Sequence, residues 1–321
     1  MQNKTMVIKN VYDCNLECWY CSTGSRTGFL STDQVLKHWK ERKPKQTLLI
    51  GGEPMILGPS YYLELLEKGM NFSIQSNLTL YTEEWDEVLL HPNFTGLSVS
   101  GDKFPTLSAF IEKYLILVDR TGRTPGVLIL FDDVTYEEAL YKGRLWMELG
   151  AEYCFDVKFN YIMPSGSCLG LVGKVLPIST VFKVYTELAI LWDKKGRKID
   201  IQPIVNLMRY IQKQESNTCP FCVNCHASES IYNVEVNEKV YPCPVLGDLE
   251  KTREEIMVDV PAECMVCEHA ELCRGCYMRS WAVEKEKDEN YCKEAKVFFR
   301  TLKRLAEKVP NVIEESNTAV R

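Results

Sequence analysis

Fourteen cysteines give this 321-residue chain its clearest capacity for chemistry, and they fall into two groups. Three lie within residues 14–21 and nine lie between residues 219 and 292, with only Cys154 and Cys168 elsewhere. Thiolates bind zinc and iron–sulfur clusters, whereas disulfide scaffolds are typical of small secreted domains. The sequence therefore predicts two metal-binding regions joined by a cysteine-poor scaffold.

The first group, Cys14, Cys18 and Cys21, follows a strand-like run with the spacing C-x3-C-x2-C. A [4Fe–4S] cluster is normally held by four cysteine thiolates, so three on one short loop leave one iron open to a substrate or cofactor. The alternative is a zinc loop, but zinc sites favour C-x2-C pairs with a fourth ligand close by, which this segment lacks. The spacing favours an iron–sulfur cluster with an open iron.

The scaffold alternates between strand-like and helix-like patterns. Strands are predicted over residues 6–11, 46–50, 72–76, 96–100, 126–131 and 153–161, and helices over 32–42, 61–68, 83–90, 106–118, 136–149 and 179–192. Ser31 or Thr32 is expected to cap the first helix. Alternation with short connections predicts parallel strands joined by right-handed crossovers. Beyond about residue 206 the periodicity fades, which places a domain boundary there.

The first cysteine group resembles the signature of the radical S-adenosylmethionine (SAM) superfamily, in which an aromatic residue, here Tyr20, precedes the third cysteine. After the second predicted strand, Gly51-Gly52-Glu53-Pro54 is similar to the segment that receives the amino group of SAM in this family. Glycines let backbone groups approach a ligand closely, and a carboxylate suits an ammonium group. The resemblance therefore implies that Gly51, Gly52 and Glu53 bind SAM.

Two other segments resemble strand ends that contact SAM in this family. Ser76 and Asn77 follow the third predicted strand, and Ser98 and Ser100 lie at the end of the fourth. The usual Asp-Gly pair is replaced there by Ser100-Gly101, and ordinary turn chemistry is the alternative for both segments. The resemblance covers roughly residues 5–200 and implies a partial (β/α)6 barrel, in agreement with the six predicted strands. It also implies reductive cleavage of SAM to a 5′-deoxyadenosyl radical that removes a hydrogen atom from the substrate.

The second cysteine group resembles a SPASM domain, the auxiliary-cluster module of radical SAM maturases. Its pattern is Cys264-x2-Cys267-x5-Cys273-x2-Cys276 followed by Cys292, with Cys225 and Cys243 upstream. Residues 237–243 are similar to the short hairpin that precedes a ligand cysteine in that family, although Glu238 stands where glycine is usual. The final pair is C-x2-C where C-x3-C is usual, which leaves the local ligand geometry open.

Eight cysteines of the second group would hold two auxiliary [4Fe–4S] clusters, which makes three clusters with the one that binds SAM. The family's interleaved pattern implies that the first is bound by Cys219, Cys225, Cys243 and Cys276, and the second by Cys264, Cys267, Cys273 and Cys292. Two zinc sites of four cysteines each satisfy the same count. Cys222 competes with Cys219 as a ligand, and it is also a candidate hydrogen-atom donor in catalysis.

The remaining candidates have ordinary explanations. Cys168 follows the sixth predicted strand, near the expected barrel mouth, and Cys154 falls within that strand. Both are expected to be inert buried thiols, with catalysis by Cys168 as the alternative. The four histidines form no metal-binding or hydrolase motif, and we expect them to be structural or solvated: His38, His91, His226 and His269.

These features predict a radical SAM partial barrel over residues 1–205, a small cysteine-rich SPASM-like domain over 206–300, and a C-terminal helix and tail over 301–321. We expect an oxidoreductase or maturase that modifies a peptide or protein by a thioether or carbon–carbon crosslink, epimerisation or oxidation. One alternative is an enzyme that oxidises or rearranges a small molecule, such as a sugar or amino acid. Another is a non-catalytic iron–sulfur or zinc module, which Glu53 and the open cysteine loop argue against.

Charge and hydropathy limit the expected partners. The formal net charge of −6 argues against a nucleic-acid partner, because such proteins usually carry a basic patch. No apolar run reaches the roughly 18–20 residues that span a bilayer, and the N-terminus has no signal-peptide layout, so we expect a cytoplasmic protein with no membrane contact. An external electron donor such as flavodoxin or ferredoxin is also expected. Because the sequence opens directly on a predicted strand, a peptide substrate would need a separate peptide-recognition protein or direct binding in the barrel mouth.

Overall fold

The computed structural model describes residues 5–132, 135–162, 175–213, 231–252, 255, 262–273 and 288–308. The chain divides into two compact units. The first comprises residues 1–128, 165–168 and 227–253, and the second comprises residues 129–164, 169–226 and 254–321. The domain boundaries expected near residues 205 and 300 stay a prediction.

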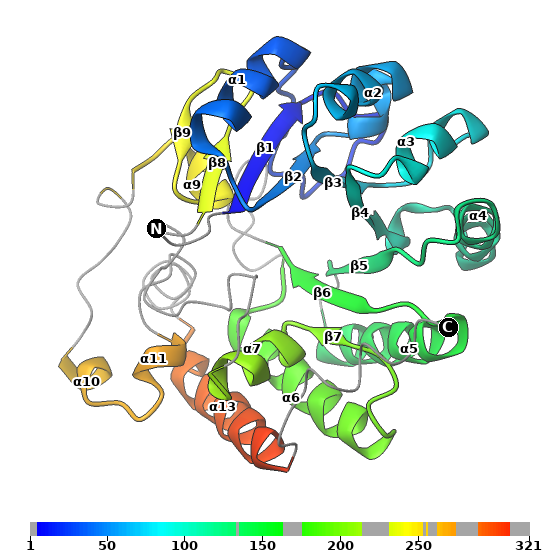
Figure 1. Cartoon of the computed structure of the whole chain (residues 1–321). Helices are drawn as coiled ribbons and strands as arrows, with labels where there is room; N and C mark the ends of the chain where they lie inside the picture. Colours follow the sequence, from blue (N-terminus) through cyan, green and yellow to red (C-terminus); the bar gives the residue numbers. More distant parts are fainter. Residues whose placement is uncertain are drawn as a thin grey trace. The chain divides into compact units, whose positions relative to one another are not determined.

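The first unit is built on a mostly parallel sheet with the strand order β5-β4-β3-β2-β1-β8-β9 (Figure 1). Its strands are β1 (Thr5–Val11), β2 (Gln46–Gly51), β3 (Phe72–Ser76), β4 (Phe94–Ser100), the first half of β5 (Gly126–Phe131), β8 (Ile231–Val234) and β9 (Val240–Tyr241). β8 pairs in parallel with β1, and β9 runs antiparallel to β8. A segment from late in the chain therefore extends the sheet beside its first strand.

Helices and short 3-10 turns connect these strands: α1 (Thr32–Arg42), η1 (Pro54–Leu57), α2 (Pro59–Glu67), η2 (Glu83–Trp85), α3 (Asp86–Leu90), η3 (Gly101–Lys103), α4 (Leu107–Thr121) and, after β9, α9 (Pro244–Leu249). The start predicted for α1 is confirmed, because Ser31 and Gln34 form a reciprocal capping box. In β3, Phe72, Ile74 and Ser76 are buried, while Ser73 and Gln75, which alternate with them, are half-buried. This period of two is typical of a strand with one face packed against helices.

The second unit contains the rest of β5, β6 (Val157–Tyr161), β7 (Ile201–Gln202), α5 (Tyr136–Tyr153), α6 (Ile178–Lys194), α7 (Ile204–Ile211), α10 (Ala262–Met265), α11 (Ala270–Cys273) and α13 (Tyr291–Glu307). β6 and β7 pair in parallel. The ring of Phe182 on α6 lies 5.6 Å from that of Phe298 and 5.8 Å from that of Phe299, both on α13. These buried aromatic side chains fix α13, whose first turn carries Cys292.

The predicted start of the sixth strand is wrong. Helix α5 continues through Tyr153, and Cys154 is its C-cap with a left-handed φ of 59°, so this exposed cysteine does not lie within a strand. We expected the helix to end at residue 149, just before Gly150, but the helix continues past this glycine. Gly150 allows neighbouring segments to pack closely against the helix. A Cβ atom at Gly150 would lie 2.6 Å from the Cδ1 atom of Ile199 and 2.7 Å from the carbonyl oxygen of Phe155.

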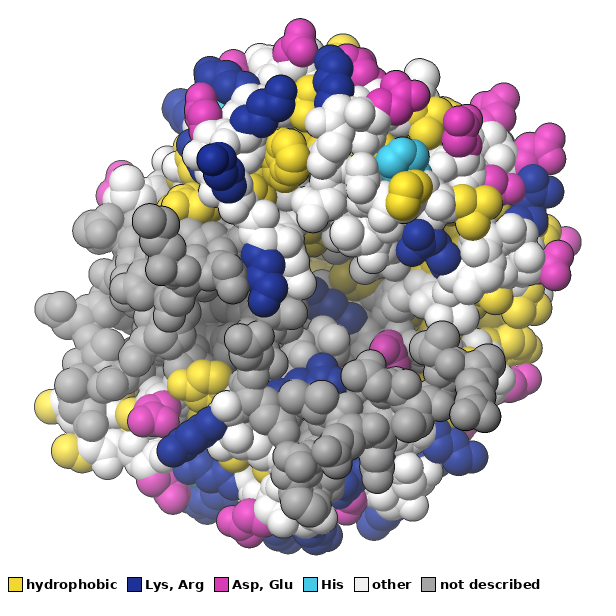
Figure 2. Space-filling model, in the orientation of Figure 1, with side chains coloured by type: hydrophobic (Ala, Val, Ile, Leu, Met, Phe, Trp, Pro, Cys, Tyr) yellow, Lys and Arg dark blue, Asp and Glu magenta, His cyan; other side chains and the backbone are white. Residues whose placement is uncertain are grey.

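Charged side chains of both signs are interspersed over the described residues on the face shown in Figure 2. The described part of that face thus presents a mixed surface, whereas a nucleic-acid interface usually presents a basic stripe. Across the described ranges, every helix is too short or too polar to cross a membrane.

Candidate functional site

The loop that carries Cys14, Cys18 and Cys21 follows β1 directly. Its backbone turns tightly, since the N–H of Cys21 donates to the carbonyl of Cys18 at 3.0 Å. Burial raises the pKa of the Cys14 thiol, and the nearby charges of Glu53, Cys21 and Cys18 raise it further. The structure thus brings the three predicted ligands and Glu53 into one neighbourhood. A metal bound there would lower the thiol pKa values and hold the sulfurs as thiolates.

The base of this loop is closed by hydrogen bonds between its two ends. The N–H of Tyr12 donates to the carbonyl of Gly28 at 2.8 Å, and the N–H of Gly28 donates to Oδ2 of Asp13 at 3.0 Å. Both bonds join the residues before Cys14 to those after Cys21. The loop is therefore a closed unit whose cysteines project from a fixed base.

Gly51 and Gly52 hold the end of β2 against the segment that leads into the loop. The N–H of Gly52 donates to the carbonyl of Val11 at 2.8 Å, and the N–H of Glu53 donates to that of Asp13 at 2.9 Å. A Cβ atom would lie 1.8 Å from the carbonyl oxygen of Val11 at position 51, and 2.2 Å from that of Asp13 at position 52. These glycines are thus required because the end of β2 lies very close to residues 11–13, which lead into the cysteine loop. This contact places Glu53 beside the cysteines.

The carboxylate of Glu53 lies in a buried cradle and is only 1% exposed. Its Oε1 accepts hydrogen bonds from Oγ of Ser76 at 2.7 Å and from the N–H of Met55 at 2.9 Å, and its Oε2 accepts one from the N–H of Asn77 at 2.6 Å. Burial raises the pKa of Glu53, while these hydrogen bonds oppose the rise. The predicted group of Glu53, Ser76 and Asn77 does come together at the ends of β2 and β3.

A chain of side-chain amides ties this cradle to the cysteine loop. Nδ2 of Asn77 donates to Oδ1 of Asn15 at 2.9 Å, and Nδ2 of Asn15 donates to Oγ1 of Thr79 at 2.8 Å. Oγ1 of Thr79 in turn donates to Oδ1 of Asn77 at 2.6 Å. Sequence reasoning missed Asn15 and Thr79. The Asx-turn spacing of Asn77 and Thr79 was a usable signal, whereas nothing local marks Asn15.

Tyr20 connects the cysteine loop to the end of β4. Its hydroxyl is hydrogen-bonded to Nζ of Lys103, which lies 4.8 Å from the centre of the Tyr20 ring and forms an ion pair with Asp102 at 3.0 Å. On β4 itself, Ser98 is half-buried and Ser100 is buried. The structure therefore places these predicted SAM contacts at strand ends of the same unit, and it adds Lys103 as a cation that the sequence did not single out.

A buried ionic network joins β1 to the segment that carries Cys243, the N-cap residue of α9. Nζ of Lys9 lies 2.9 Å from Oε1 of Glu235 and is hydrogen-bonded to Asp248 on α9. Nη2 of Arg26, from the base of the cysteine loop, lies 2.8 Å from Oδ1 of Asp248. The cations and anions balance, as buried charges require. The network fixes Cys243 in the same unit as the first three cysteines.

The hairpin expected before Cys243 is confirmed as β8 and β9. Glu238 in its turn has φ 62°, the left-handed region that glycine adopts most easily, and this is the position where glycine is usual. The Glu238 side chain makes contacts that offset the strain. It accepts a hydrogen bond from Nε2 of Gln34 at 2.9 Å and lies 3.4 Å from Nε2 of His38, both on α1.

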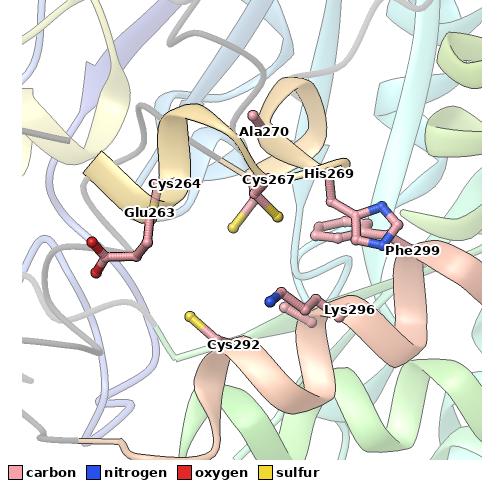
Figure 3. Close-up of a pocket in the computed structure, with 10 residues that line it drawn as sticks. Glu263, Cys264, Cys267, His269, Ala270, Cys292, Lys296 and Phe299 are labelled. Carbon is pink, nitrogen blue, oxygen red and sulfur yellow. The ribbon is translucent and has the colours of Figure 1, made fainter. Parts of the chain in front are cut away.

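In the second unit, one cavity of about 90 Å³ is lined by the four cysteines assigned to the second auxiliary cluster: Cys264, Cys267, Cys273 and Cys292. They come from α10, from the turn that follows it, from α11 and from the start of α13 (Figure 3). His269, Lys296 and Phe299 also line this cavity, which we call the cysteine cavity. Four cysteines separated by up to 28 positions in the sequence therefore meet at one place.

The cysteine cavity fits a group larger than a single ion. One water molecule needs about 10–15 Å³ of such space, so the cavity has room for several atoms. Nowhere in the described ranges do three Cys, His, Asp or Glu side chains approach closely enough to bind one metal ion. His269 gives a second reason to expect a bound group in this cavity. Its side chain is 1% exposed, and its Nδ1 has no hydrogen-bond partner among the described residues. A buried polar nitrogen without a partner is costly, and a cluster or cysteine sulfur could supply one.

Six of the candidate residues lie outside the described residues: Cys168, Cys219, Cys222, Cys225, His226 and Cys276. All four ligands of the first auxiliary cluster, Cys243 included, and the role of Cys222 as ligand or hydrogen-atom donor therefore stay predictions.

No protein-family model matches the sequence, and no curated protein matches it either. Among solved structures, SuiB from Streptococcus suis bound to S-adenosylmethionine is 14% identical, with a TM-score of 0.60 over 85% of this chain and 73% of SuiB. SuiB bound to its precursor peptide SuiA gives the same identity and TM-score over 85% of this chain and 72% of SuiB. A structure of BtrN with AdoMet and 2-DOIA gives 11% identity and a TM-score of 0.38, which carries no argument. The similarity to SuiB confirms the radical SAM partial-barrel fold predicted from the sequence.

Proposed function

We propose that this chain is a radical SAM enzyme that modifies a peptide or protein substrate. The observation that carries the proposal is the carboxylate of Glu53, which is buried beside the cysteine loop with no cationic partner among the described residues. A buried carboxylate needs a compensating charge, and the ammonium group of SAM supplies one. The similarity in fold to SuiB, which binds SAM, supports the same choice.

The residues around Glu53 have separate tasks in this proposal. Cys14, Cys18 and Cys21 would hold a [4Fe–4S] cluster with one open iron. When bound and reduced, such a cluster would supply the electron for reductive cleavage of SAM, the chemistry by which this class of enzyme removes a hydrogen atom from a substrate. Glu53 would orient the amino group of SAM, because its Oε2 accepts a single hydrogen bond from the described residues, which leaves a lone pair for the ammonium group. Gly51 and Gly52 place Glu53, while Tyr20, Ser98 and Ser100 would complete the SAM site.

A peptide substrate is supported by the structure of SuiB with its precursor peptide SuiA. We propose the same substrate class for this chain, with the auxiliary clusters held by the second cysteine group. Flavodoxin or ferredoxin would supply electrons, and a separate protein or the barrel mouth would recognise the peptide. The cysteine cavity supports the assignment of Cys264, Cys267, Cys273 and Cys292 to one cluster.

The proposal is tested by SAM cleavage in the anaerobically reconstituted chain. We expect about twelve irons per chain, four for each of three clusters, and release of 5′-deoxyadenosine after reduction with dithionite. Replacement of Cys14, Cys18 and Cys21 together by alanine should remove about four irons and abolish 5′-deoxyadenosine formation. Iron analysis with Mössbauer spectroscopy and chromatography of the nucleoside product measure both.

The matched control is Cys154→Ala, because this exposed cysteine caps α5 and is not an expected ligand. It should keep full iron and activity. A chain that binds its full iron but releases no 5′-deoxyadenosine would overturn the proposed function. Tight binding of two zinc ions in place of iron would overturn the auxiliary clusters alone.

A further inference from the structure

Among the described residues, two charged side chains line the cysteine cavity, Glu263 and Lys296, and they are oriented differently. Figure 3 shows the amine of Lys296 directed into the space between Cys267 and Cys292, while the carboxylate of Glu263 turns away from the cysteines. Lys296 lies four positions after Cys292 on α13, so the two side chains share one face of the helix. The cavity therefore faces one directed positive charge.

Two other lysines of α13, Lys293 and Lys303, have polar partners outside the cysteine cavity. Nζ of Lys303 donates to the carbonyl of Glu268 at 3.1 Å, and Nζ of Lys293 lies 3.4 Å from Oε1 of Glu294. Lys296 has no ion-pair or hydrogen-bond partner among the described residues. Its charge is thus uncompensated where the four cysteines meet.

A [4Fe–4S] cluster with four thiolate ligands is anionic and gains one further negative charge on reduction. Its reduction potential depends on net charge, on hydrogen bonds to sulfur and on solvent exposure. A nearby cation favours the reduced form, because the Coulomb attraction is larger for the more negative state. Solvent screens part of this effect, since Lys296 is an exposed residue.

We propose that Lys296 raises the reduction potential of the cluster bound in the cysteine cavity. The inference rests on the proposed function, because it requires the second auxiliary cluster. Lys296 is not a ligand in this proposal but a tuning residue that acts through its charge. Its replacement should therefore change a potential without changing the iron content.

The test uses the full-length chain with Cys14, Cys18 and Cys21 replaced by alanine, so that only auxiliary clusters remain. Redox titration followed by electron paramagnetic resonance gives the midpoint potential of each signal. Addition of Cys267→Ala identifies the signal of the cysteine cavity by its loss. Lys296→Met should lower the midpoint potential of that signal, and Lys296→Arg should keep it near its original value.

Lys293→Met is the matched control, because it removes the same charge beside Cys292 from a side chain that does not line the cavity. It should leave the potential unchanged. An unchanged potential in Lys296→Met with full iron, or an equal shift in Lys293→Met, would overturn the role of Lys296 and leave the cluster assignment standing. Zinc without iron in the cavity would overturn the role together with the cluster.

Discussion

The two cysteine regions differ in what holds them in place. Around Cys14, Cys18 and Cys21, the backbone itself builds the site, through hydrogen bonds that close the loop and join it to the glycine turn at the end of β2. Around the cysteine cavity, the cysteines stand on α10 and α11, helices of only four residues each, in the turn between them and on the first turn of α13. Helices this short are not stable by themselves.

This difference teaches that hydrogen bonds between backbone segments are enough to hold the first region, whereas the second would need a group shared by its cysteines to join its short elements. In the first region the buried carboxylate of Glu53 already has three hydrogen-bond donors in place. In the second, the cavity lies between separate short helices, and a cluster with four ligands would crosslink them. The predictions below test that contrast.

The largest effect is expected from removal of iron. Hydrogen exchange in residues 262–273 should accelerate by roughly a thousandfold or more, equivalent to about 4 kcal/mol, because a cluster held by these cysteines would bind only the folded form of α10 and α11. Exchange in residues 46–53 and 72–77 should change by less than about twofold. Mass spectrometry of the reconstituted and iron-free chain measures both regions in one experiment. Equal acceleration of exchange in the two regions would show that they depend on iron to the same extent, which would contradict the proposed difference.

A smaller effect is expected from Gly52→Ala in the iron-free chain. Its Cβ atom would lie 2.2 Å from the carbonyl oxygen of Asp13, so two backbone segments must separate. We expect a loss of about 2–3 kcal/mol in the free energy of unfolding, measured by urea denaturation. The control is Gly96→Ala on β4, where the nearest atom would be 4.0 Å away, and it should cost less than about 1 kcal/mol. Similar losses for the two variants would mean that the turn can relax.

The smallest change in free energy is expected for a single ligand contact. Glu53→Ala should weaken SAM binding by roughly 10- to 150-fold, since loss of a charge-assisted hydrogen bond costs about 1.5–3 kcal/mol. The cluster should remain, because Glu53 is not a ligand. Equilibrium dialysis with SAM and iron analysis measure the two properties. Glu64→Ala, which removes an exposed carboxylate on α2, should leave the affinity unchanged, and equal affinity in Glu53→Ala would exclude Glu53 from the SAM site.

Sequence reasoning predicted most of the first region because its signals are local. β3 and β5 coincide with the predicted strands over residues 72–76 and 126–131, since each is an apolar run with clear turn residues at its ends. The family resemblance assigned Glu53, Ser76 and Asn77 to the same ligand, and the structure places them in hydrogen-bond contact. Parallel strands bring such residues to one edge of the sheet.

What the sequence could not predict is long-range pairing. The pairing of β8 with β1, and of Lys9 with Glu235 and Asp248, joins residues more than 200 positions apart and leaves no periodic pattern near either partner. The role of Gly150 was hidden for the same reason, because its packing partner Ile199 comes from another part of the chain. The resemblance to a SPASM domain did group the four cysteines that line the cysteine cavity, but nothing in it pointed to Lys296, whose position follows from the helical register of α13.

The ionic network around Lys9 has a consequence for how the chain folds while it is being synthesised. Asp248 follows Lys9 by 239 positions, so β1 leaves the ribosome long before its partners β8 and α9 exist. During that interval, one edge of β1 is open and carries a hydrated lysine. A charge on a strand edge discourages wrong pairing with other chains. The charge of Lys9, which later pairs with Glu235 and Asp248, would therefore disfavour wrong pairing of β1 until β8 and α9 have been synthesised.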